Sequence, residues 1–239
     1  MDLQPYLIYW SIGAAFFAAE ALWPSRPLQY RRVIVYDLVS LGLYNLFFLV
    51  AVFLTSQLAV PNYVPDRMQG LPFAMKLLVF ILLVDCSAYW LHRIWHTAWL
   101  WPLHRWHHAP VYMYWLAGIR ASLPQVVMAG LPFMIGLPLL RPVPAWFFPL
   151  YSVFLIVTNN WMHMNTTWRS SWLEWVLVTP RYHHVHHGTT PDCYERNFGV
   201  VFSMWDRLFG TYANPEERPS NFPFGIRESV HPVRLVLGL

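Results

Sequence analysis

The segment LPFAMKLLVFILLVDCSAYWLHRIWH, residues 71–96, joins a long apolar run to two histidines. Between residues 71 and 91 the only charged side chains are Lys76, at one end, and Asp85, in the middle. A bilayer core about 30 Å thick is crossed by about 20 apolar residues, because each helical residue adds about 1.5 Å. The run therefore predicts a membrane-crossing helix that carries His92 and His96 to one membrane surface.

Four further windows are long and poor in charge. Residues 6–23 contain only Glu20, residues 33–60 contain only Asp37, and residues 121–140 and 143–163 contain no Lys, Arg, Asp or Glu. The last two windows flank RPVP at 141–144 and predict a returning hairpin. Its first arm is expected to be irregular because it contains prolines, and whether the hairpin crosses the bilayer completely stays open.

The composition also favours a membrane protein. The chain is 56% hydrophobic and 12% charged, whereas soluble domains carry about 25% charged residues. The N-terminal window lacks the basic start and cleavage site of a signal peptide, which favours a retained membrane helix. We therefore predict an all-α, polytopic membrane bundle of four to five transmembrane helices with a cytosolic helical cap.

One domain is expected over residues 1–239, with N-terminal transmembrane helices at 1–70, a histidine-rich catalytic region at 71–212 and a C-terminal tail at 213–239. The two cysteines, Cys86 and Cys193, are too few for a disulfide framework. The net charge is +4, but the basic residues are spread along the chain rather than clustered, so no nucleic-acid binding is expected.

Histidines recur in three short boxes with helical spacing. Positions three or four apart share one face of a helix, so the members of each box converge. His184 is left out of the third box, YHHVHHG, because it points away from the other members. The box members and the histidine that ends the fifth window are His92, His96, His104, His107, His108, His163, His183, His186 and His187.

The predicted topology places all of these histidines on one membrane surface. With that topology, only Arg67, Lys76 and Arg141 of the sixteen Lys and Arg residues lie on the opposite side. Cytoplasmic loops carry an excess of Lys and Arg, so the histidine surface is predicted to be cytoplasmic.

So many neutral imidazoles exceed what one metal centre can use, and two metals are the simplest interpretation. A site rich in nitrogen and without thiolate fits non-haem iron that activates dioxygen better than structural zinc. Zinc can still replace iron during expression. Asp85, two turns before His92, either supports a ligating histidine or forms a buried hydrogen bond to Tyr or Trp.

Three stretches carry a family resemblance: DCSAYWLHRIWH, LHRWHHAP and TPRYHHVHHGTTPDCYERNFGVVFSMWDRLFGTY. Over roughly residues 85–212 the chain resembles the integral-membrane fatty acid hydroxylase and sterol desaturase superfamily. The resemblance implies a helical membrane bundle under a cytosolic cap, and a di-iron centre held by the eight box histidines. His163 matches an additional ligand of the family.

The resemblance also marks residues around the metal centre. Some relatives have a further histidine where this chain has Asn159, so a weaker or indirect contact to the metal is expected at this position. Arg120 matches a family arginine, although Gln125 stands where an acid is common. The positions expected to brace the metal site, in a catalytic or a purely structural role, are Asn197, Trp205, Asp206 and Arg207.

The predicted activity is dioxygen-dependent hydroxylation or desaturation of an unactivated C–H bond in a lipid-like substrate, such as a fatty acyl chain or sterol. The substrate would enter from the bilayer along a channel, although the residues proposed to line it could equally be core or interfacial aromatics. These residues are Trp90, Trp95, Trp115 and Trp161. Electrons must come from an external donor of the b-type cytochrome, ferredoxin or flavin reductase type, since the chain has no motif for such a cofactor.

Other classes of protein also use closely spaced histidines. A zinc hydrolase is disfavoured because HRIWH lacks the glutamate that follows the first histidine of H-E-x-x-H. A histidine-rich metal-binding protein or transporter without oxygenase activity is the main alternative, but transport sites gather near the midplane of the bilayer. A helical haem-binding electron carrier would need only one histidine pair per haem. Neither predicts three boxes on one face.

Overall fold

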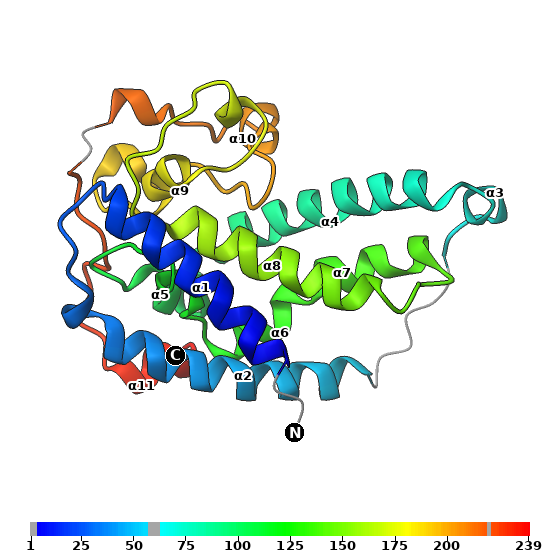
Figure 1. Cartoon of the computed structure of the whole chain (residues 1–239), viewed down its shortest axis with the longest axis horizontal. Helices are drawn as coiled ribbons and strands as arrows, with labels where there is room; N and C mark the ends of the chain where they lie inside the picture. Colours follow the sequence, from blue (N-terminus) through cyan, green and yellow to red (C-terminus); the bar gives the residue numbers. More distant parts are fainter. Residues whose placement is uncertain (1–3, 57–62, 219–220) are drawn as a thin grey trace.

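The computed structural model describes residues 4–56, 63–218 and 221–239. Over these residues the chain is helical, and the only β-type pairings are two isolated bridges, Leu177–Phe202 and Gly188–Phe224. The helices at residues 34–56, 73–95 and 147–163 run roughly along the longest axis of the molecule, the helix at 4–22 crosses them obliquely, and the short helices after residue 163 gather at one end (Figure 1). The predicted all-α class is confirmed.

The elements follow one another without a repeat. The α-helices are α1 (Gln4–Leu22), α2 (Ile34–Ser56), α3 (Asp66–Gln69), α4 (Phe73–Trp95), α5 (Trp101–His108), α6 (Leu123–Ala129), α7 (Leu131–Gly136), α8 (Phe147–His163), α9 (Pro180–His187), α10 (Met204–Leu208) and α11 (Pro232–Leu237). The 3-10 helices are η1 (Tyr30–Arg32), η2 (Ala117–Ile119), η3 (Leu137–Leu140), η4 (Leu173–Trp175), η5 (Pro191–Cys193) and η6 (Pro215–Glu217).

Two stretches in the described part of the chain are long and apolar enough to cross a membrane. They are α4 and the 18-residue stretch Leu123–Leu140, which α6, α7 and η3 form together. The apolar parts of α1 and α2 are shorter. Each predicted window therefore contains helix, although the end of the second window, residues 57–60, lies outside the described residues.

The arm from Leu123 to Leu140 is broken into three helices, as its prolines predicted. Pro124, Pro132 and Pro138 each stand in the first turn of one of these helices. Proline lacks a backbone N–H and is tolerated in a first turn, where that N–H has no partner within the helix. Each proline therefore starts a new short helix instead of continuing the preceding one.

This broken arm packs against α4. Phe80 is 1% exposed and forms a core cluster with Leu140 and Phe147. A Cβ atom on Gly136 would lie 2.6 Å from Val84 Cγ2 and 2.8 Å from the Phe80 ring, so only glycine permits this approach of α7 to α4. The contact holds α4 in place, and α4 carries the first two histidines.

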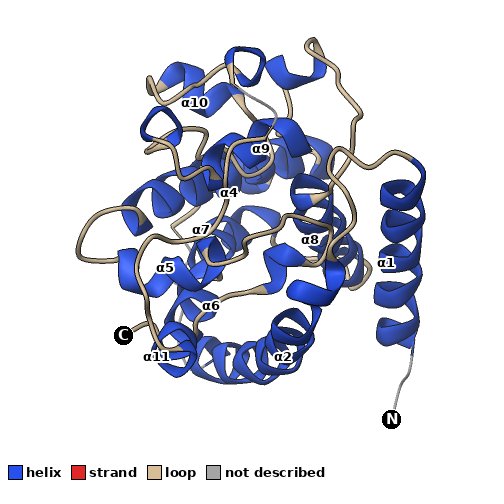
Figure 2. Cartoon of the chain, turned by 90° about the vertical axis from the view of Figure 1, so that its left-hand side faces the viewer, coloured by secondary structure: helices blue, strands red, loops and turns tan. Residues whose placement is uncertain are grey.

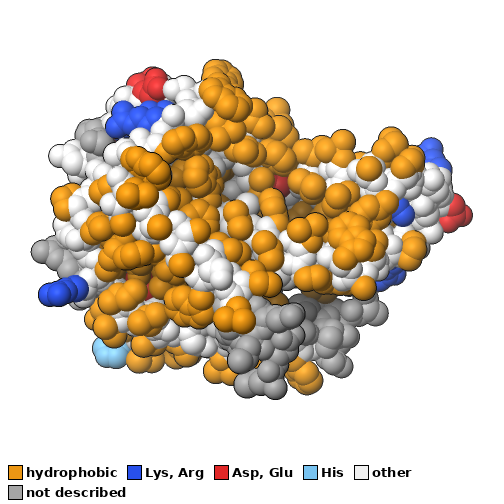
Figure 3. All heavy atoms as spheres, in the orientation of Figure 1, with side chains coloured by type: hydrophobic (Ala, Val, Ile, Leu, Met, Phe, Trp, Pro, Cys, Tyr) orange, Lys and Arg blue, Asp and Glu red, His pale blue; other side chains and the backbone are white. Residues whose placement is uncertain are grey.

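The short helices α9 and α10 lie over the ends of α4 and α8, as the view from the end of the bundle shows (Figure 2). In the face drawn in Figure 3, hydrophobic side chains cover most of the middle of the molecule, and most visible charged side chains lie at the ends of the long axis. An apolar middle with charged ends is the distribution expected of a protein that lies in a bilayer.

Candidate metal centre

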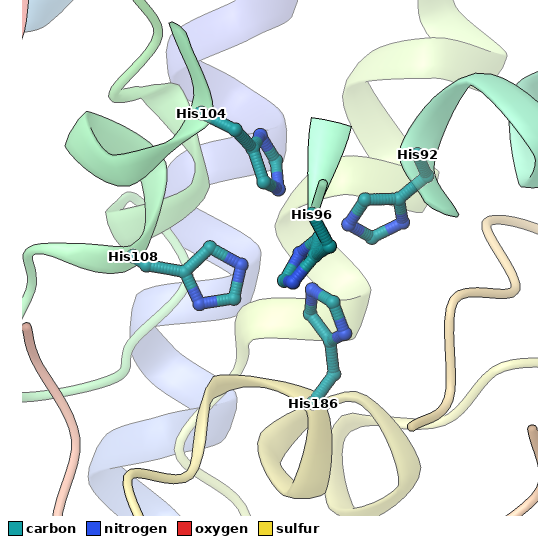
Figure 4. A group of neighbouring side chains, drawn as sticks. All are labelled: His92, His96, His104, His108 and His186. Atoms are coloured by element: carbon teal, nitrogen blue, oxygen red, sulfur yellow. The ribbon is translucent and has the colours of Figure 1, made fainter. Parts of the chain in front are cut away.

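Nine histidines meet in two adjoining groups where α4, α5, α8 and α9 come together. The group of five is His92, His96, His104, His108 and His186, and the group of four is His107, His163, His183 and His187. Within each group, one ring nitrogen from every member lies within 4.8 Å of those of the other members. Figure 4 shows the rings of the group of five converging on a common space from three helices.

The spacing of the boxes explains how the two groups interlock. On α5, His104 and His108 are four apart and face the group of five, whereas His107 faces the group of four. On α9 the assignment is reversed, because His183 and His187 share one face and His186 lies on the other. Each of these helices thus contributes to both groups, and the ring centroids of His108 and His187 are only 4.4 Å apart.

The group of five offers unpartnered nitrogens to a cation. All five Nε2 atoms are buried without a hydrogen-bond partner among the described residues. In two of the rings the opposite nitrogen is bonded to a backbone carbonyl: His92 Nδ1 to Phe198 O at 2.9 Å, and His186 Nδ1 to Arg196 O at 2.9 Å. A carbonyl can only accept, so these Nδ1 atoms carry the proton and the Nε2 lone pairs point at one another. A bound metal satisfies such lone pairs.

In the group of four, nitrogens crowd together in the same way. His183 Nε2 lies 3.2 Å from His163 Nε2 and 3.0 Å from His187 Nε2. His163 Nδ1 donates to Asn159 O at 2.7 Å, so the Nε2 of His163 is an acceptor. A proton on His183 Nε2 can serve one of these two neighbours well, whereas a metal ion among the nitrogens serves all of them.

Burial keeps these imidazoles in the form that binds metals. Desolvation is the main cause that holds the pKa of His104, His107 and His108 well below the ordinary histidine value, and neighbouring histidines add to it. The same causes lower the pKa of His183, His186 and His187. The rings are therefore neutral at pH 7, and neutral imidazole is a common ligand for iron, zinc and copper.

His184 belongs to neither group, as the helical spacing of the third box predicted. Its Nε2 lies 3.3 Å from the backbone oxygen of His163, on the side of α9 away from the other imidazoles.

The sequence suggested two roles for Asp85, and the structure places it in the second. Its carboxylate accepts hydrogen bonds from Val201 N at 2.9 Å, Phe202 N at 2.9 Å and Trp205 Nε1 at 2.8 Å. No bond joins it to His92, whose Nδ1 is bonded to Phe198 instead. Asp85 therefore fastens the loop after α9 to α4, and the orientation of His92 comes from that loop.

Asp206 and Asn197 hold the same loop from the other side. The Asp206 carboxylate accepts from the backbone N–H groups of Phe198 and Gly199, both at 2.7 Å, and from Tyr182 Oη at 2.9 Å. Asn197 has a φ of 55°, in the left-handed region that asparagine tolerates better than most residues, and its amide bonds to the backbone of Tyr182 and Ala213. Both side chains fix the Phe198 carbonyl that orients His92.

Arg120 and Asn159 act through their backbone oxygens. Arg120 O lies 3.3 Å from His107 Nδ1, and the guanidinium forms a buried ion pair with Asp37. Asn159 contributes its carbonyl oxygen, not its side chain, to His163. A Cβ atom on Gly118 would lie 2.4 Å from His163 Nδ1, so glycine is required where η2 meets this ring.

The four tryptophans predicted to line a channel lie in different surroundings. Trp95 is 7% exposed and stacks on His104, with ring centroids 5.1 Å apart. Trp115 is buried in the core against Gly13, and Trp161 donates to Val178 O. Trp90 is 40% exposed on the outside of α4. Trp95 alone among them stacks on a metal-site ring, so a shared channel wall stays a prediction.

Sequence reasoning missed the contribution of the first two helices. Glu20 is fully buried and accepts hydrogen bonds from Trp115 N, Asn165 N and Tyr30 Oη at 2.7–2.8 Å. Asp37 binds Arg120 and Tyr114. Each is the only acid in its apolar window, and intramembrane acids are expensive, so the signal that drew attention to Asp85 was present here too.

The chain is similar to a known protein family and to several characterised proteins. The family model described as fatty acid hydroxylase matches residues 77–211. An alkylglycerol monooxygenase of Danio rerio is 32% identical over 136 residues, which is 56% of this chain and 30% of that protein. An ornithine lipid hydroxylase of Rhizobium tropici is 28% identical over 176 residues, covering 71% of this chain and 50% of that protein.

A methylsterol monooxygenase of Arabidopsis thaliana is 26% identical over 140 residues, covering 57% of this chain and 47% of that protein. The matched stretches thus span half or less of the length of these curated relatives. No solved structure matches the chain.

Proposed function

This chain belongs to the fatty acid hydroxylase family, and from that premise we propose that it is a membrane-bound, dioxygen-dependent di-iron oxidoreductase that hydroxylates or desaturates a C–H bond of a lipid-like substrate. The observation that carries the proposal is the pair of histidine groups, with five and four ring nitrogens within 4.8 Å of one another. The relatives named above are monooxygenases or hydroxylases of lipids. A transport site spread through the bilayer would not gather nine histidines at one end of the bundle.

We assign one iron to each group of histidines. When bound, the irons would supply the activation of dioxygen that an unactivated C–H bond requires. An all-imidazole donor set without thiolate agrees with iron, and zinc is the expected contaminant on expression.

The chain itself positions the ligands and excludes water. The carbonyls of Phe198, Arg120, Asn159 and Arg196 hold the Nδ1–H of four rings, which directs their Nε2 atoms inward. Trp95 covers His104 on one side, and eight of the nine histidines are buried. A dry, preorganised site strengthens electrostatic interactions and keeps reactive species from water.

We further propose that the protein is multi-pass and that the histidine end faces the cytoplasm. Arg67 and Lys76 lie near α3, at the end of α4 opposite His92 and His96, whereas most basic residues belong to the histidine side. Residues 1–70 would then be transmembrane helices, 71–212 the catalytic region under a helical cap, and 213–239 a tail. An external donor of the b-type cytochrome, ferredoxin or flavin reductase type would approach this side.

Comparative lipid mass spectrometry of cells with and without the protein tests the activity. A gain of one oxygen in a lipid identifies a hydroxylase, and a loss of two hydrogens identifies a desaturase. His107→Ala removes a member of the group of four and should abolish the product, whereas His231→Ala, an exposed histidine at the start of α11, should leave it unchanged. A lipid profile identical with and without the wild-type protein would contradict the proposal.

Metal analysis provides a second, independent test. The purified wild-type protein should carry about two irons per chain, one for each histidine group, without haem absorbance. His231→Ala should carry the same amount, and His107→Ala less. Haem absorbance, or no bound metal in a folded protein expressed with iron, would refute the di-iron assignment.

A further inference from the structure

A second candidate site lies on the other face of α9 from the histidine groups. It is a pocket of about 400 Å³ formed by the loop after α1, the loop after α8, α9, residues 215–218 and Phe222. Six of its lining residues matter for its chemistry: Arg26, Arg169, Arg181, His184, Glu216 and Arg218. We propose that this pocket binds a phosphate group, from a lipid headgroup or from a soluble phosphate ester.

The charge of the lining favours an anion. Four arginines, from four separate segments, face a single acid in the pocket, Glu216. Planar guanidinium groups bind phosphate oxygens in a bidentate manner, which makes arginine the preferred residue for such sites. The four guanidiniums repel one another, and the one acid of the lining offsets only part of their charge, so an anion in the pocket would be stabilised.

The neighbouring acids neutralise these arginines only in part. Arg181 donates from Nε and Nη2 to Glu174 at 3.0 and 2.8 Å, its Nη2 also lies 3.5 Å from Glu216 Oε1, and Asp192 Oδ2 lies 3.1 Å from Arg218 Nε. Among the described residues no acid comes within ion-pair distance of Arg169, and Nη1 of Arg181 makes no hydrogen bond. Donors therefore remain for the oxygens of a phosphate.

The arginines are also held in place before any ligand binds. Arg26 donates from Nη2 to Phe222 O at 2.9 Å, and its guanidinium lies 4.2 Å from the centre of the Phe224 ring. The buried Glu174, which is 4% exposed, accepts hydrogen bonds from the Arg181 guanidinium and fixes its position. A preorganised side chain loses little conformational entropy on binding, so these contacts favour affinity as well as fold.

His184 connects the pocket to the metal centre. It lines the pocket, its Nε2 lies 3.3 Å from the backbone oxygen of His163, and it follows His183 directly on α9. An occupant of the pocket would therefore lie next to His184, which adjoins His183 in the sequence and contacts the backbone of His163. The site is distinct from the one that carries the proposed oxygenase activity, and its binding function does not depend on that activity.

Calorimetric titration of the full-length, metal-loaded protein in a maltoside detergent, which contains no phosphate, tests the proposal. The three probes are inorganic phosphate, glycerol 3-phosphate and short-chain phosphatidic acid. Wild-type protein should bind at least one probe saturably at millimolar concentration or below. A lipid source predicts at least about 10-fold tighter binding of phosphatidic acid than of glycerol 3-phosphate, and a soluble source predicts equal or weaker binding.

Two variants and a matched control locate the site. Arg169→Gln removes an exposed arginine and should weaken binding about 10-fold, as should Ser25→Asp, which places a carboxylate in the pocket. The matched control Arg67→Gln makes the same Arg-to-Gln change in α3, at the far end of the molecule, and should bind the probes as the wild type does. The proposal is overturned if the wild-type protein shows no saturable binding. It is also overturned if Arg169→Gln and Ser25→Asp, with unchanged melting temperatures, bind the probes as tightly as the wild type does.

Discussion

Gly118→Ala should remove one metal of the proposed pair and leave the other. The added Cβ would lie 2.4 Å from His163 Nδ1, 2.5 Å from His163 Cε1 and 2.9 Å from Asn159 Nδ2. Carbon atoms in contact are separated by about 3.5 Å, so the imidazole must move by about 1 Å. A metal–nitrogen distance tolerates a change of only about 0.2 Å, so His163 can no longer share a metal with the rest of its group.

The expected result is about one iron per chain instead of two, with metal affinity in the group of four reduced on the order of 100-fold. None of the three atoms nearest the new methyl group belongs to the group of five, which should keep its metal. Overpacking costs about 1–3 kcal/mol in unfolding free energy, which lowers the melting temperature by roughly 2–12 °C. Iron analysis of the purified protein and a thermal melt measure the two effects.

Gly42→Ala is the matched control, because no atom lies within 4 Å of a Cβ at this exposed position of α2. It should keep both irons and gain up to about 1 kcal/mol in stability, since alanine is the better helix former. A Gly118→Ala protein with two irons and wild-type activity would show that His163 does not bind metal, or that η2 moves freely away from it.

Three further outcomes are expected. Asp85→Asn loses at least one of three hydrogen bonds to a charged acceptor, which costs about 1.5–3 kcal/mol and lowers the melting temperature by roughly 3–12 °C. The control Asp66→Asn, on the exposed α3, should leave the melting temperature unchanged. Equal melting temperatures for the two variants would contradict the role of Asp85 in fastening the loop. In metal-free protein the buried histidines, such as His104 and His108, have a pKa held below that of the unfolded chain. Stability is therefore fully present above about pH 6.5 and falls as the pH drops below that value. The loss is up to about 1.4 kcal/mol per pH unit for each histidine that gains a proton on unfolding. Thermal melts at about pH 7.5 and about pH 5.5 measure this change, and a flat profile would show that the rings are accessible to solvent. Chelation should lower the melting temperature of the wild-type protein, because each emptied site loses about 2.7 kcal/mol of stabilisation where free metal had stood at 100 times its Kd. The shift should be smaller in His107→Ala, which keeps only the group of five intact, and equal shifts in the two proteins would place the second metal elsewhere.

The helices and the convergence of the histidines could be predicted from the sequence because both depend on local spacing. Apolar windows predicted the long helices, and separations of three and four residues predicted that members of one box share a face. The exclusion of His184 followed from the same periodicity, and so did the irregular arm interrupted by Pro132 and Pro138.

The division of the nine histidines between two groups could not be predicted in this way. His107 and His186 depart from the other members of their boxes because of how α5 and α9 are rotated against each other, which depends on contacts far apart in the chain. The role of Asp85 was left open for the same reason. Its partners, Val201, Phe202 and Trp205, lie more than a hundred residues away and are mostly backbone N–H groups, which no residue pattern marks.

The acceptors that orient four of the imidazoles are main-chain oxygens, belonging to Phe198, Arg120, Asn159 and Arg196. Every amino acid carries that oxygen, so the side chains at these four positions are free to diverge through evolution without loss of the bond to histidine. An alanine scan would pass over the bonds themselves, and a letter-by-letter comparison of distant relatives would find no trace of them. Replacing the backbone amide that follows each carbonyl with an ester, which weakens the oxygen as an acceptor, is the substitution that would reveal these bonds.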